Sequence, residues 1–102
     1  MASRLTLQTE LEKILGSSNV YFQPPESVKM NYPAIVYGRS SGDTQFANNR
    51  PYIFVRSYDI TVIDKNPDSE IAENIVKHFP MSRYDRNFKS DNLNHDVVHI
   101  YY

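Results

Sequence analysis

Cysteine and tryptophan are absent from this 102-residue chain, and glycine occurs only 3 times. The lack of cysteine excludes disulfides, zinc–thiolate sites, iron–sulfur clusters and cysteine nucleophiles. With 3 glycines we expect no glycine-rich phosphate cradle. We also expect no Gly-x-Ser-x-Gly elbow of a serine nucleophile. No apolar run approaches the roughly 20 residues of a membrane span, and the N-terminus lacks the basic-then-apolar pattern of a signal peptide. We therefore expect no cofactor, no enzymatic activity and no membrane association.

The length of the chain fits one domain, residues 1–102, and is too short for two. A formal net charge of -1 gives no whole-chain reason to expect nucleic acid or an anionic membrane as a partner. Tyrosine is unusually frequent, with 8 copies. Because tyrosine combines an apolar ring with a polar hydroxyl, it suits half-buried strands and interfaces.

The stretch Ile53–Asp64 is rich in β-branched and aromatic residues and contains neither glycine nor proline. Its second half alternates, with Tyr58, Ile60 and Val62 on one side, as in a strand with one buried face. Such a strand would reach roughly 40 Å, which is more than a small domain needs. We therefore expect part of it to project as a hairpin arm or a subunit contact.

Two helices are predicted from apolar stripes, Thr6–Leu15 ending at Gly16, and a second one capped by Asn66, beginning at Pro67 and stopped by Pro80. Further strands are predicted at Asn19–Gln23, Tyr32–Ser40, Met81–Lys89 and His95–Tyr102. Simple alternation places Ser82, Tyr84, Arg86 and Phe88 on one face of the fourth strand, opposite Arg83, Asp85 and Asn87. The order α-β-β-β-α-β-β indicates an α+β fold, a mostly antiparallel sheet with both helices packed on one face.

The polar segment Ser41–Pro51 joins two predicted strands, so we interpret it as a long hairpin loop. Phe46 stands in its middle. An aromatic residue on such a loop either awaits a partner or folds back onto its own domain, and the sequence leaves both open. The loop residues that we expect at an interface are Phe46, Asn48, Asn49 and Arg50.

A second candidate surface surrounds Arg83, Arg86 and Lys89 beside Phe88. Basic residues interleaved with aromatics are typical of surfaces that bind single-stranded nucleic acid. The alternative is that these arginines form surface or intersubunit ion pairs, for example Arg86 with Asp85. We favour that alternative, because the chain as a whole is acidic, and assign Arg83 and Arg86 to an interface.

A metal site at His95 and His99 is not expected. Four positions apart on a strand, they share a face but lie roughly 13 Å apart, which is too far for one ion. Asp96 points the other way. We expect structural histidines and no metal ligands.

Five segments resemble small neck proteins of long-tailed bacteriophages, which are described as tail terminator, tail completion or head–tail joining proteins. These segments are Tyr32–Tyr37, Tyr58–Asp64, Asn66–Ser69, Tyr84–Arg86 and Asp91–Asp96. The resemblance covers about residues 28–102 and concerns segments and their order, without a catalytic signature.

The resemblance implies a virion protein of the head–tail interface, assembled in the host cytoplasm as a hexameric ring of identical subunits. Such a ring caps the tail tube, so its partners are the major tail tube protein and the head connector or stopper protein. DNA passes through it without specific binding, and it has no cofactor. The alternatives are a head-completion or connector stopper protein of the same neck region, or a small nucleic-acid-binding module.

Overall fold

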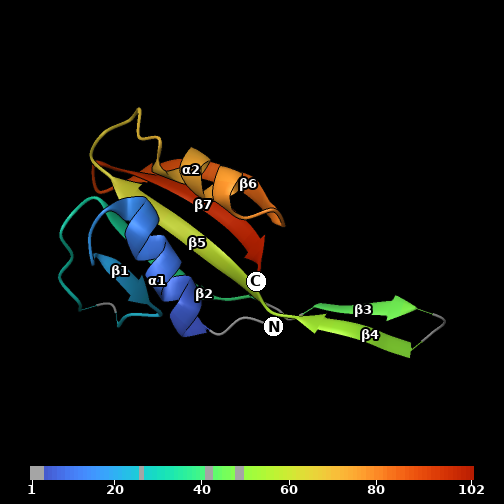
Figure 1. The fold of residues 1–102 in the computed structure, drawn as a ribbon. Coiled ribbons are helices and arrows are strands. Elements are labelled where there is room, and N and C mark those ends of the chain that lie inside the picture. The colour runs from blue at the N-terminus through green and yellow to red at the C-terminus, as the bar shows by residue number, and fades with distance from the viewer. Residues whose placement is uncertain (1–3, 26, 41–42, 48–49) are drawn as a thin grey trace.

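The computed structural model describes residues 4–25, 27–40, 43–47 and 50–102, and for 43–47 and 50–55 it describes the backbone alone. In chain order the elements are α1 (Arg4–Leu15), β1 (Val20–Phe22), β2 (Ala34–Arg39), β3 (Asp43–Ala47), β4 (Arg50–Val55), β5 (Ser57–Asp64), α2 (Ile71–His78), β6 (Ser82–Ser90) and β7 (Leu93–Tyr101). Figure 1 shows both helices over one face of the main sheet.

The main sheet has five strands in the order β1-β2-β5-β7-β6, and only the β1–β2 pair is parallel. The predicted α+β fold with a mostly antiparallel sheet is therefore confirmed. The order α-β-β-β-α-β-β holds for this sheet and its helices, and strands β3 and β4 are added as a separate two-stranded sheet.

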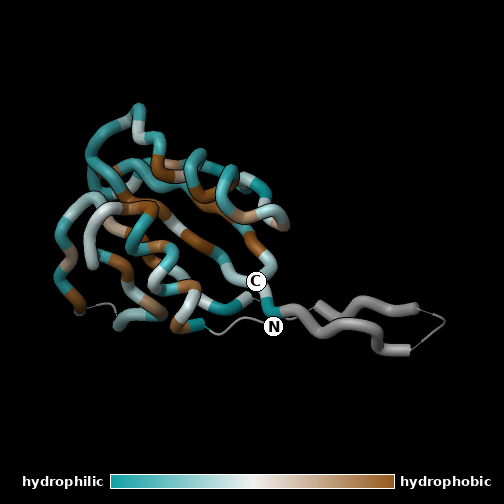
Figure 2. Tube along the Cα trace, viewed as in Figure 1, coloured by the Kyte–Doolittle hydropathy of each residue, from teal (hydrophilic) through white to brown (hydrophobic). Residues whose placement is uncertain are grey.

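The core lies between the helices and the sheet. Tyr58, Ile60 and Val62 alternate along β5 toward the helices, as the sequence predicts, and all are fully buried. Tyr37 pairs with Ile60, and the neighbouring strands add apolar residues to the same face. Figure 2 shows the apolar stretches along β5 and β7 beneath the helices. Burial of this face is the main favourable contribution to folding.

Helix α1 packs on the sheet through Leu7 and Leu11, which have no exposed surface. The spacing of its apolar residues gives one stripe, which confirms the predicted helix. Gly16 ends it with a φ of 83°, a left-handed conformation that glycine adopts without strain, and its N–H donates to the carbonyl of Glu12 at 2.9 Å.

Helix α2 begins later than predicted, at Ile71. Asn66 and Pro67 lie before it, so the predicted cap and first helical position are wrong. The Asn66 side chain accepts a hydrogen bond from the N–H of Asp68 at 2.9 Å, and Asp64 accepts one from the N–H of Asn66 at 3.0 Å. These side-chain contacts turn the backbone after β5 and compete with helix formation there.

The stretch Ile53–Asp64 is not one strand, which corrects the sequence-based prediction. Arg56 separates β4 from β5, and β4 pairs antiparallel with β3, which lies inside the predicted loop Ser41–Pro51. The chain forms a hairpin here because the backbone of one strand satisfies the hydrogen bonds of the other. Figure 1 shows this β3–β4 hairpin, hereafter the arm, extending beyond the end of the main sheet. The expected projecting arm is thus confirmed.

Hydrogen bonds fix the root of the arm. The N–H of Ser40 donates to the carbonyl of Ser57 at 3.0 Å, and the hydroxyl groups of the two serines lie 2.5 Å apart. The N–H of Tyr102 donates to the carbonyl of Arg56 at 2.9 Å. Ser57 is 1% exposed, so its hydroxyl contact with Ser40 is largely shielded from water where the arm leaves the body.

Substitution of Ser57 by alanine is expected to lower the free energy of unfolding by about 1 kcal/mol, because the buried hydroxyl contact with Ser40 is lost. Urea denaturation of Ser57→Ala, Ser40→Ala and the double variant measures this. The double variant should lower the free energy of unfolding by clearly less than the sum of the losses in the two single variants. Full additivity would show that the two hydroxyls do not interact.

Candidate functional site

Strand β6 contains a β-bulge that changes the faces of its side chains. Tyr84 pairs with Val98 and Arg86 pairs with Val97, so Asp85 is an extra residue. Since paired residues lie on the same face, Tyr84 is on the helix side and Arg86 on the open side of the sheet. The predicted common face for Ser82, Tyr84, Arg86 and Phe88 is therefore wrong.

The bulge brings both predicted interface arginines of β6 onto the open face. Arg83 pairs with His99 and Arg86 pairs with Val97, and His99 and Val97 alternate with the buried Val98 of β7. Arg86 also makes an ion pair of 2.9 Å with Asp85. That contact is the one the sequence favoured over nucleic-acid binding, although an exposed pair of this kind adds little stability.

The histidines of β7 share a face, as predicted, and this face is the open side of the sheet. Each histidine has a contact. The ring of His95 stacks on Phe88 with centroids 4.7 Å apart, and His99 Nδ1 lies 2.8 Å from Asp59 Oδ1. Among the described residues, no group of three or more histidine, aspartate and glutamate side chains is arranged to hold a metal ion.

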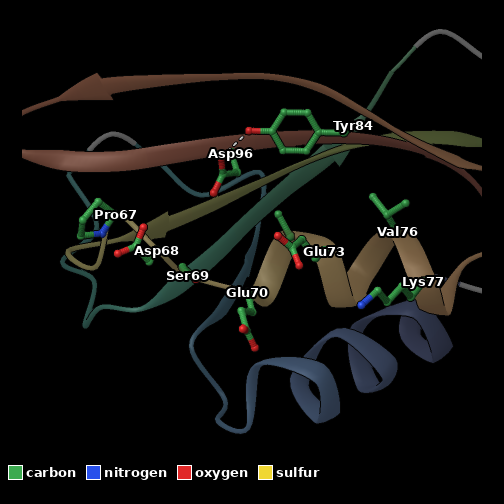
Figure 3. A pocket seen from close by; sticks show the side chains of 10 residues that line it. Pro67, Asp68, Ser69, Glu70, Glu73, Val76, Lys77, Tyr84 and Asp96 are labelled. Carbon is green, nitrogen blue, oxygen red and sulfur yellow. Dashed lines mark hydrogen bonds between the residues drawn. The ribbon is translucent and has the colours of Figure 1, made fainter.

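A hollow of about 640 Å³ lies between α2 and the β6–β7 pair (Figure 3). Its floor includes Ala72 and Val76. Figure 3 shows Tyr84 beside the Asp96 carboxylate, to which it donates a hydrogen bond of 2.5 Å. Half of the remaining lining residues are acidic, and the others include one lysine: Asp68, Glu70, Glu73, Lys77, Pro67 and Ser69.

The hollow carries more acidic than basic side chains. Partial desolvation, followed by the hydrogen bond to Asp96, raises the pKa of Tyr84 to about 12, so its phenol stays protonated at neutral pH. The hydroxyl of Ser69 accepts a hydrogen bond from the N–H of Ile71 at 3.4 Å, so it supports the backbone before α2. No sequence pattern indicates this hollow, because its residues come from three separate parts of the chain, residues 67–77, Tyr84 and Asp96.

Residues 38–42 read Gly-Arg-Ser-Ser-Gly, which matches the letters of the Gly-x-Ser-x-Gly motif, so the expectation that the chain lacks these letters is wrong. The motif requires a sharp turn from a strand into a helix. Here β2 leads toward β3, and the hydroxyl of Ser40 contacts that of Ser57. The letters match, but the next described element after Ser40 is strand β3 and not the helix that the motif requires.

A hydrogen-bonded cluster joins α1, α2 and the last residue. Tyr102 donates to Glu10 Oε2 at 2.5 Å, and His78 Nε2 lies 3.2 Å from Glu10 Oε1. The bond from Tyr102 is the largest cause that lowers the pKa of Glu10, and contacts with His78 act in the same direction. The cluster therefore favours the ionised form of Glu10 in the folded protein.

Because the pKa of Glu10 is lower in the folded than in the unfolded chain, its stabilising contribution is present above its ordinary value of 4.5. That contribution is lost as the pH falls through the folded value. Tyr102→Phe is expected to move the pKa of Glu10 back up toward its ordinary value, as measured by carbon-13 NMR titration of the carboxyl groups. Tyr84→Phe removes a hydroxyl that donates to Asp96 instead, so it should leave the pKa of Glu10 unchanged. An unchanged pKa in Tyr102→Phe would refute the assigned cause.

The predicted interface residues fall into two groups that the structure does not bring together. Phe46 lies on β3 and Arg50 on β4, where only the backbone is described, and Asn48 and Asn49 lie outside the described residues. Figure 1 shows the arm extending from the ends of β2 and β5, away from β6, which carries Arg83 and Arg86.

The exposure of β6 is a further feature that sequence reasoning missed. Every residue from Arg83 to Ser90 is exposed, including Tyr84 at 47% and Phe88 at 44%. Met81, just before the strand, is 52% exposed. Tyr84 and Phe88 lie on opposite faces of this strand, and exposed aromatic side chains of this kind are typical of interaction surfaces.

The fold and these surfaces define a small α+β domain with a projecting arm and an exposed edge strand. Comparison with protein-family models finds no match, and no curated protein sequence is significantly similar to this chain. Within the described part of the chain, neither helix is long and apolar enough to cross a bilayer.

Proposed function

We propose that this protein is a ring-forming structural subunit of a bacteriophage neck, a tail terminator that caps the tail tube and offers a docking surface to the head. The observation that carries the proposal is the arm, a separate two-stranded sheet beyond the end of the main sheet. An isolated hairpin is marginally stable in water, and its open edges favour pairing with another chain.

The shape of the subunit supports assembly into rings. Its extents are 49 × 23 × 22 Å, and the long dimension includes the arm. The arm and the exposed strand β6 are different surfaces, so an arm that docks on β6 makes a head-to-tail contact. Head-to-tail contacts produce a closed ring when the rotation between subunits closes, and a fibre when it does not. We propose a homohexameric ring in the virion, as the sequence resemblance implies.

In this proposal one face of the ring covers the last ring of the major tail tube protein, and the other face meets the head connector or stopper protein. The protein acts by blocking polymerisation and presenting a new surface, without enzymatic activity or cofactor. DNA passes through the lumen without specific binding. A lumen with few exposed cations would suit that passage, because phosphate contacts would retard the DNA.

Electron microscopy of the purified protein, alone and mixed with polymerised tail tube protein, tests the proposal. We expect closed rings alone and density capping one end of each tube. Rings that bind the portal-side adaptor but leave tubes uncapped would support the connector stopper alternative. Fibres, or particles without a lumen, would contradict the ring.

The second candidate is a nucleic-acid-binding module, and one observation favours it. The bulge in β6 places Arg83, Arg86 and Phe88 on the same open face. Filter binding of single-stranded DNA at low and high salt separates the two functions. The ring proposal predicts weak binding without sequence preference, whereas tight binding with a steep salt dependence would favour the module.

A further inference from the structure

We propose that the second half of β6, Arg86–Ser90, is the docking edge for strand β3 of a second copy of this chain. The docked strand would extend the main sheet beyond β6. The inference rests on the proposed function, since it names the surface on which neighbouring subunits of the ring meet.

The outer edge of β6 is available for pairing. Strand β7 pairs with its inner side, and no strand within the described residues pairs with its outer side. A strand edge without a partner presents a row of N–H and C=O groups that another strand can bind. The opposite edge of the sheet is β1, a strand of 3 residues, which offers far fewer such groups.

The bulge restricts pairing to the second half of β6. The register with β7 shifts between Tyr84 and Arg86 and then runs without interruption from Arg86, opposite Val97, to Ser90, opposite Leu93. Five regular residues span roughly 17 Å. A tight turn through Asp91 and Asn92, both with positive φ, ends the edge.

Strand β3 fits this edge better than β4 does. It has 5 residues, Asp43–Ala47, and no proline. Strand β4 contains Pro51, which has no N–H to donate and so weakens it as a pairing edge. The charges agree, because β3 carries one acidic residue, Asp43, and the docking edge carries two basic residues, Arg86 and Lys89. By contrast, β4 carries a basic residue of its own, Arg50.

The arm cannot dock on the β6 of its own chain in this conformation. It extends away from the main sheet, and β6 lies beyond β7 from the strand ends where the arm begins (Figure 1). A second copy is therefore the occupant. Docking adds a third strand to the arm, which stabilises a hairpin that is marginal alone.

Cross-linking between introduced cysteines tests the inference cleanly, because the natural chain has none. One copy carries Gln45→Cys in the middle of β3, and a second copy, fused to a larger tag, carries Asn87→Cys on β6. A short bismaleimide linker is added to the mixed, assembled protein, and denaturing electrophoresis detects the mixed dimer. The matched control pairs Gln45→Cys with Lys13→Cys, an exposed position on α1. We expect the mixed dimer to form with Asn87→Cys and to be absent with Lys13→Cys.

The outcomes separate the inference from the proposed function. Two outcomes would overturn β6 as the docking edge and leave the ring intact. One is a yield of mixed dimer with Lys13→Cys that equals or exceeds the yield with Asn87→Cys, and the other is assembled protein that gives neither product. Protein that stays monomeric by light scattering would overturn the ring and, with it, the inference.

Reversing the charges on β6 and β3 tests the docking independently. Arg86→Glu with Lys89→Glu is expected to weaken assembly a few-fold, and adding Asp43→Lys should restore it, because the opposite charges are exchanged. Lys13→Glu with Lys29→Glu, which makes the same change of charge at two exposed lysines outside β6, should leave assembly unchanged. Equal effects of the two double changes would contradict docking on the second half of β6.

Discussion

Replacing residues 41–56 with Asn-Gly is expected to convert the assembled protein into a folded monomer. In the variant a two-residue turn connects Ser40 to Ser57. Such a turn suits the antiparallel strands β2 and β5, because the N–H of Ser40 already donates to the carbonyl of Ser57 at 3.0 Å. It removes the arm and, in our proposal, the contact that holds neighbouring subunits together. Sedimentation velocity of both proteins at the same concentration measures the change.

The fold should survive this change, because the helices and the main sheet pack on one another through residues outside 41–56. Circular dichroism should show the helix content retained, and urea unfolding should remain cooperative. The direct bond from Tyr102 to Arg56 is lost, so a modest fall in stability is expected. An armless protein that still forms particles of the natural mass would show that other surfaces hold the ring.

The largest effect on stability is expected for Leu11→Ala. Leu11 has no exposed surface and packs in the core between α1 and the sheet. Removing three buried carbon atoms and leaving a cavity should lower the free energy of unfolding by about 2–5 kcal/mol. Urea denaturation of the armless monomer measures this without interference from assembly.

Leu5→Ala is the matched control, because it removes the same atoms from the same helix at a residue that is 66% exposed. Its expected cost is within about 0.5 kcal/mol. Similar losses for the two variants would show that α1 does not pack on the sheet through Leu11.

The periodic elements of the fold could be predicted from the sequence. Leu7 and Leu11 on one helical stripe, and Tyr58, Ile60 and Val62 on one strand face, predicted the buried surfaces because burial imposes a period on each element. The start of α2 was placed too early, because Asn66 forms a turn instead of the expected cap. A capping residue and a turn residue are chemically the same type, so the sequence pattern alone did not distinguish them.

The candidate surfaces were less predictable, because they depend on pairing between distant segments. The bulge at Asp85 has no local signal, yet it reverses the face of Arg86 and Phe88. The acidic hollow depends on Tyr84 meeting Asp96 from the next strand, beside a helix that precedes both. The arm was expected from the length of Ile53–Asp64. Its other strand, β3, was not, because it lies within a segment whose turn residues indicate a loop.

The mass of the purified protein in solution tests the central proposal, that this chain works through surfaces completed by its own copies. Size-exclusion chromatography with light scattering measures it directly. A hexamer of the 11.9 kDa chain should give about 71 kDa. A mass of 11.9 kDa that does not change with protein concentration would contradict the account.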